Sequence, residues 1–163
     1  MKDSSIIHYF ENLARQHRLV RHSDESCHFS SILDDAQNKY AQKMEYPCVV
    51  LEMDDILWGG TIGNTLENET VSVLFVDHVT DAGDFEQVHR VFDLTGTIMR
   101  DFLRRMNRDR NQPHSIMARF NPDGAQASRI ALDSAGLYGW ALSFAFSRSF
   151  PYLDCNHAFL DHL

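Results

Sequence analysis

The chain has 163 residues and a formal net charge of −8, and 44% of its residues are hydrophobic while 23% are charged. This length and composition are typical of one globular domain that buries its own core without disulfides or a structural metal. The negative charge argues against a general nucleic-acid binder, and no apolar run approaches the ~18 residues that a membrane-spanning helix needs.

The cysteine pattern indicates a reducing compartment. Cys27, Cys48 and Cys155 lie far apart, their number is odd, and none stands in a CxxC motif. Such thiols are typical of cytosolic proteins. The first residues also lack the unbroken apolar segment of a secretory signal peptide, so a cytoplasmic protein is expected.

The first third of the chain predicts two helices followed by a strand. Residues 4–18 place their apolar side chains on one face of an amphipathic helix. Residues 21–28 are polar and predict a loop, and residues 30–43 favour a second helix that ends before Pro47. The apolar run at residues 48–53 is typical of a short buried strand.

A long loop is predicted next. Residues 54–69 are rich in glycine, asparagine and acidic residues, and loops of this length are usually functional or mobile. Ile56, Leu57 and Trp58 lie on it. Exposed, they would form an adhesive tip; alternatively, they fold back onto the domain. Residues 70–79 then predict a strand with apolar side chains on both faces.

The longest predicted helix lies between Asp84 and Arg110. Its apolar residues recur at spacings of three and four, and Asp84 with Gln87 fits a capping box. Acidic residues stand at its start and arginines at its end, as the helix dipole favours. The arginines are the one candidate for a local basic patch, although a solvated face is the favoured reading. So long a stripe needs a sheet to cover it.

Strands are predicted after this helix at residues 115–120 and 137–150, and residues 127–132 are expected to form a short strand or an extended link. The strand at 137–150 is the clearest, because large and small side chains alternate along it. The large face should lie under the long helix. The small face is flat and can accept another backbone layer closely, either a neighbouring subunit or the first helix. The alternating residues are Tyr138, Trp140, Leu142, Phe144 and Phe146 against Gly139, Ala141, Ser143, Ala145 and Ser147.

These elements predict an α+β fold in one domain, 1–163. A mostly antiparallel sheet of four to five strands is expected to pack against a long central helix and an N-terminal helix, because runs of strands are not separated by helices. The core is expected within residues 4–150. Residues 151–163 are expected to form an extension that docks on a neighbour.

The densest polar cluster, Asp77, His78, Asp81 and Asp84, offers ligand types for a divalent metal. However, Asp81 and Asp84 suit a capping role, and the side chains of Asp77 and His78 point to opposite faces of a strand. No nucleophile elbow, Gly-Lys-Ser phosphate loop or GxGxxG motif is present. We therefore expect no enzyme, no cofactor and no metal, and keep a small enzyme or metal-binding protein using these four residues as the alternative.

The order of elements resembles a known family. It comprises an N-terminal helix, Tyr46-Pro47 with a short strand, an acidic loop, the stretch DHVTDAGDF, the long helix and the stretch YGWALSFAF. Over most of residues 4–150 this resembles small phage-tail proteins of Bacteroidetes prophages and tail-like elements, which are similar to tail terminator or tail-completion proteins. The chain departs from them by its segment at 21–43 and its tail after Phe150.

The resemblance implies an α+β subunit of a homo-oligomeric ring, expected to be a hexamer, at the head-proximal end of a tail tube. Such a ring stops tube growth and joins tube, sheath or neck proteins; contractile injection systems use similar parts. It implies assembly in the cytoplasm and residence in a virion or tail-like particle, with no membrane and no direct nucleic-acid recognition. A small adaptor that dimerises through its sheet remains a third reading.

The residues expected to contact other copies lie on the apolar loop, the small strand face and the tail. They are Ile56, Leu57, Trp58, Ala141, Ser143, Ala145, Tyr152 and Phe159.

Overall fold

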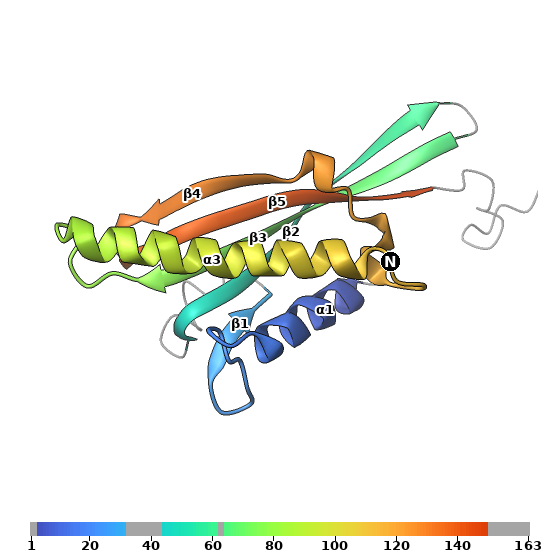
Figure 1. Ribbon diagram of the computed structural model, residues 1–163. Coiled ribbons are helices and arrows are strands. Elements are labelled where there is room, and N and C mark those ends of the chain that lie inside the picture. The colour runs from blue at the N-terminus through green and yellow to red at the C-terminus, as the bar shows by residue number, and fades with distance from the viewer. Residues whose placement is uncertain (1–2, 32–43, 62–63, 150–163) are drawn as a thin grey trace, which may run out of the picture.

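The computed structural model describes residues 3–31, 44–61 and 64–149. Within them the chain is α+β, with two α-helices and a five-stranded sheet in the order β1-β2-β3-β5-β4 (Figure 1). Strands β1 and β2 are parallel and every other pair is antiparallel, which confirms the predicted class and the mostly antiparallel sheet. The elements are α1 (Asp3–Gln16), β1 (Cys27–Ser30), β2 (Met44–Thr61), β3 (Asn64–His78), α3 (Phe85–Asp109), β4 (Gln126–Leu132) and β5 (Leu137–Ser149).

Both helices lie on one face of the sheet, with α3 running across it and α1 beside α3 (Figure 1). The main core forms between these two layers, because the apolar stripe of each helix meets the apolar face of the central strands. Its central members are Ile6 and Phe10 of α1, Ile98, Phe102 and Met106 of α3, Val71, Val73 and Phe75 of β3, and Leu142, Phe144 and Phe146 of β5.

The start of α3 follows the predicted cap. The side chain of Asp84 accepts a hydrogen bond from the backbone N–H of Gln87 at 3.0 Å, which satisfies one of the free amides at the helix start. The other half of a capping box is replaced, because the Gln87 side-chain oxygen accepts from the hydroxyl of Thr80 at 3.2 Å. The helix ends at Asp109, close to the predicted boundary.

The alternation along β5 is confirmed. Phe144 is buried against the helices, and Trp140 is half-buried on the same face. The indole N–H of Trp140 donates to the backbone carbonyl of Phe92 in α3 at 3.0 Å. Gly96 permits this approach, since a Cβ there would stand 3.0 Å from the same indole nitrogen. The first helix packs on this large face, so the prediction that it might cover the small face is wrong.

Two predicted elements are wrong. The loop at residues 54–69 is instead the outer part of the β2–β3 hairpin, paired as far as Thr61 with Asn64. The strand at 115–120 is a 3-10 helix, Ile116–Arg119, whose first turn is capped by the side chain of Ser115. Met117 within this turn and Phe120 directly after it are both buried, three positions apart, a spacing that a helical turn places on one side and a strand does not.

The N-terminal connection also differs from prediction. Strand β1 occupies residues 27–30, across the end of the predicted loop and the beginning of the predicted second helix. The remainder of that helix, residues 32–43, lies outside the described residues. The set of predicted strands therefore matches the structure only roughly, because β1 is present and the strand at 115–120 is absent.

Candidate functional site

The outer part of the β2–β3 hairpin forms an arm, residues 56–61 and 64–69, that projects beyond the layer of helices (Figure 1). It begins at a bulge, because Met53 stands opposite Val71 while Ile56 stands opposite Glu69. Two residues on β2 thus face one on β3, an insertion that increases twist and redirects a strand. Gly60, with φ of 103°, supplies the backbone conformation required near the turn.

Three large apolar side chains are exposed on this arm. Leu57 is 62% exposed, Trp58 61% and Ile56 41%. Of the two readings left open by the sequence, the exposed one is therefore correct and the folded-back one is wrong. The three residues lie on a paired strand and not on a loop. The pairing register between β2 and β3 therefore sets the direction of each side chain.

The register divides the three residues between the two faces of the arm. Ile56 stands opposite Glu69 and Trp58 opposite Glu67, on the same face as the helix-covered core residues of β3. Leu57 stands opposite Asn68 on the other face. Ile56 and Trp58 thus lie on the helix side of the sheet, beside Glu69 and Glu67, which are buried while Ile56 and Trp58 are exposed.

The small face of β5 is partly covered by other residues of the same chain. Ala141 packs beside a buried cluster that includes Leu74 and Val76. The hydroxyls of Ser143 and Ser72 lie 2.9 Å apart across the strand pair, and Ala145 is half-buried. These three predicted contact residues therefore lie together on one face, but that face is away from Trp58.

Two predicted contact residues, Tyr152 and Phe159, lie outside the described residues. The eight predicted residues consequently divide into an exposed arm, a half-buried strand face and this undescribed pair. Of these groups, the arm alone offers large exposed apolar side chains within the described part of the chain.

The carboxylates of the polar cluster all bind backbone amides. Asp77 accepts from the N–H of His78 at 2.7 Å, Asp81 from Gly83 at 2.8 Å, and Asp84 from Gln87 at 3.0 Å. Burial raises the pKa of Asp77, while the His78 amide lowers it. Among the described residues, no group of three His, Cys, Asp or Glu side chains could hold a metal ion.

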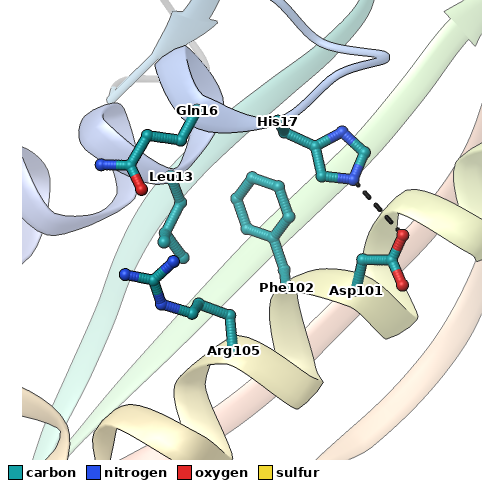
Figure 2. Close-up of a pocket in the computed structure, with 6 residues that line it drawn as sticks. All are labelled: Leu13, Gln16, His17, Asp101, Phe102 and Arg105. Atoms are coloured by element: carbon teal, nitrogen blue, oxygen red, sulfur yellow. Dashed lines mark ion pairs between the residues drawn. The ribbon is translucent and has the colours of Figure 1, made fainter.

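A groove of about 110 Å³ between α1 and α3 was not foreseen from the sequence. Figure 2 shows Phe102 at its centre, with His17 and Asp101 on one side and Arg105 on the other. Leu13 and Gln16 of α1 complete its lining. The lining residues come from two segments that are more than eighty positions apart in the sequence, so no local sequence pattern predicts the groove.

Hydrogen bonds orient the polar walls of this groove. The Nδ1 atom of His17 accepts from the N–H of Leu19 at 3.3 Å, which places the proton of a neutral ring on Nε2. That Nε2 lies 3.5 Å from a carboxylate oxygen of Asp101, the pair dashed in Figure 2. On the other side, Nε of Arg105 donates to both oxygens of Asp109, at 3.0 and 2.8 Å.

The Cys48 thiol lies in a buried cluster on the sheet face away from the helices. Burial raises the pKa of this thiol, which disfavours the reactive thiolate.

No protein-family model and no curated protein matches the chain. Among the described residues, none of the helices combines the length and the apolar character needed to cross a membrane.

Proposed function

We propose that the chain is a structural subunit that assembles with copies of itself through the β2–β3 arm. The observation that carries the proposal is the exposure of Leu57 and Trp58, each more than 60% exposed, on a paired hairpin. Large apolar side chains gathered on one projecting element mark interaction sites, and Trp is enriched among the residues that dominate binding energy.

The proposed setting is a phage tail or contractile tail-like particle. There the subunit forms a ring, of about six copies, that terminates or completes the tube and contacts tube, sheath or neck proteins. This assignment rests on the resemblance of the element order and of the stretches DHVTDAGDF and YGWALSFAF. The α+β fold and the apolar arm are compatible with it. Assembly takes place in the cytoplasm, and the product is a virion or tail-like particle.

The variant Trp58→Asp tests self-assembly. A charge at a desolvated contact is costly, so the apparent association constant should fall at least about thirtyfold, as for a contact worth 2 kcal/mol or more. Light scattering coupled to size exclusion gives the mass of parent and variant. The melting temperature should hardly change, because Trp58 lies outside the core. A variant that assembles like the parent would remove the arm from the interface.

The tail-particle setting needs its own test. Tube protein should be polymerised with and without this chain and examined by electron microscopy. We expect shorter tubes with a ring at one end when the chain is present. Tubes of unchanged length without such rings would refute the terminator role while leaving self-assembly intact.

A further inference from the structure

We propose that two histidines in opposite protonation states, a charged His28 and a neutral His22, hold β1 to β2 and α1 and make its attachment depend on pH. Strand β1 is the four-residue edge strand of the sheet and lies beside α1 (Figure 1). Its pairing with β2 is irregular between Cys27 and Phe29, where His28 lies. This inference does not depend on the proposed self-assembly.

Both ring nitrogens of His28 have hydrogen-bond partners. Nδ1 lies 2.9 Å from the carbonyl oxygen of Pro47 on β2, and Nε2 lies 2.9 Å from the hydroxyl oxygen of Ser26. A carbonyl oxygen can only accept, so Nδ1 carries a hydrogen. The Ser26 hydroxyl has one hydrogen and donates it to a carboxylate oxygen of Glu45 at 2.6 Å. Nε2 must therefore donate to the hydroxyl oxygen, which requires a hydrogen on both ring nitrogens.

This arrangement contains one proton more than a neutral imidazole and a carboxylate supply together. In water, an imidazole binds a proton about a hundredfold more tightly than a glutamate carboxylate does. The Glu45 side chain is 60% exposed and keeps its hydration, so the extra proton belongs to His28, whose Nε2 lies 3.5 Å from the same carboxylate oxygen. Loss of this proton leaves the Ser26 hydroxyl with two acceptors and one hydrogen, and one of its two contacts breaks.

The ring of His22 has the opposite requirement. Its Nδ1 accepts the backbone N–H of His28 at 3.1 Å, so this nitrogen cannot carry a proton. Burial and the nearby Arg15 guanidinium lower the pKa of His22, while the Glu11 carboxylate, 3.6 Å from Nε2, acts in the opposite direction. Protonation of Nδ1 would remove the acceptor of the His28 amide.

The charged groups that the described residues place near the two rings are Glu11 and Arg15 of α1 and Glu45 of β2, and each ring also faces the other. Arg15 is itself paired with Glu11 at 3.0 Å and with Asp24 at 2.7 Å. The local field at His22 therefore comes from α1, whereas the charge that faces Nε2 of His28 comes from β2.

Acid and base therefore act on β1 through different residues. The folded state binds a proton at His22 more weakly than the unfolded chain does. Its contribution is fully present above the ordinary histidine pKa of about 6.5 and is lost as the pH falls below that value. The contact of His28 with Ser26 and Glu45 is lost as the pH rises. Detachment of β1 would open the edge of β2 between Met44 and Val50, and open edges pair with other strands.

Ring-nitrogen NMR of the full chain measures both protonation states and requires no substitution. At pH 6.5 we expect His28 to carry a hydrogen on both ring nitrogens and His22 to carry one, on Nε2. A single ring hydrogen on His28, or a hydrogen on Nδ1 of His22, would overturn the proposal.

Amide hydrogen exchange tests the effect of acid on β1. The protection factor of the His28 amide should fall at least about tenfold between pH 6.5 and 4.5, because its acceptor is lost, while the amides of β3 keep theirs. His22→Asn should retain the protection at pH 4.5, since the amide oxygen of asparagine accepts a hydrogen bond and does not titrate. Equal protection of the parent at both pH values, or the same loss in His22→Asn, would refute the role of His22.

Glu45→Gln tests the charge that faces His28. The glutamine keeps an acceptor for the Ser26 hydroxyl but removes the negative charge, so the proton affinity of the His28 ring should fall at least about threefold. Glu25→Gln is the matched control, because it removes a carboxylate from an exposed position on the connection that precedes β1. Equal titration of the His28 ring in both variants would refute its pairing with Glu45.

Discussion

Gly139 shows how one residue determines the packing of the central strands. It pairs with Val76 on β3, and a Cβ atom there would lie 1.9 Å from the backbone carbonyl oxygen of Phe75. No side chain fits at that distance without moving a backbone. The small residue that the sequence pattern assigns to a flat face is thus required by a close approach of two strands.

Gly139→Ala should therefore destabilise the fold by about 3 kcal/mol or more, since backbone must shift to admit the methyl group. Chemical denaturation measures the free energy of unfolding. Gly124→Ala is the matched control, because nothing lies within 4 Å of its added Cβ. Equal stability of the two variants would mean that β3 and β5 are not in this register.

A second residue-scale feature joins α1 to the end of α3. The hydroxyl of Tyr9 donates to the buried carboxylate of Asp109 at 3.0 Å, and Arg105 donates to the same carboxylate. Burial and the Asp109 carboxylate raise the pKa of Tyr9 above its ordinary value. The folded state thus holds the phenol proton more tightly than the unfolded chain does.

Tyr9→Phe should cost about 1.5 kcal/mol near neutral pH, as expected for a hydrogen bond to a charged group. The contribution of Tyr9 is fully present below the unfolded phenol pKa of about 10 and is lost as the pH rises above it. Denaturation curves from pH 8 to 11 should therefore converge for parent and variant. A constant difference across that range would show that Tyr9 does not donate to Asp109.

At the scale of elements, the sequence predicts correctly those helices and strands whose hydrophobic pattern repeats within a single segment. The stripe of α3 and the alternation of β5 repeat within one segment, so their periods identify both. The arm was predicted as a loop because Gly59, Gly60 and the acidic residues are poor strand formers, and pairing with residues 64–69 overrides that propensity. The four residues of β1 are too few to show a period.

The candidate site was predicted in part for the same reason. Trp58 and its neighbours could be recognised as an apolar group, but their exposure depends on how far the helices extend over the sheet. The groove brings His17 to Asp101 across two helices, and a single sequence carries no signal for that pairing.

Phe144→Ala tests the packing of β5 beneath the helices. Phe144 is 2% exposed and contacts Phe10, Phe120 and Phe146, so its truncation should cost about 3–5 kcal/mol. Phe85→Ala is the control, because Phe85 is 75% exposed at the start of α3 and should change stability little. A loss below 1 kcal/mol at Phe144 would contradict the assigned face of β5.

At the scale of the whole molecule, the helices and the sheet enclose a core whose buried polar groups are hydrogen-bonded, and the arm extends past this core. No buried side-chain nitrogen or oxygen among the described residues lacks a hydrogen-bond partner. The hydrophobic clusters found among the described residues include no residue of the arm. Such a division suits a subunit that folds first and assembles afterwards, and it predicts that arm variants lose association without losing stability.

The mass of the intact parent protein in solution decides whether the chain assembles with copies of itself. Native mass spectrometry and sedimentation over a hundredfold range of concentration should show a closed species of about six copies that gives way to monomer on dilution. A protein that stays monomeric across that range, including in the presence of tail-tube protein, would contradict the account.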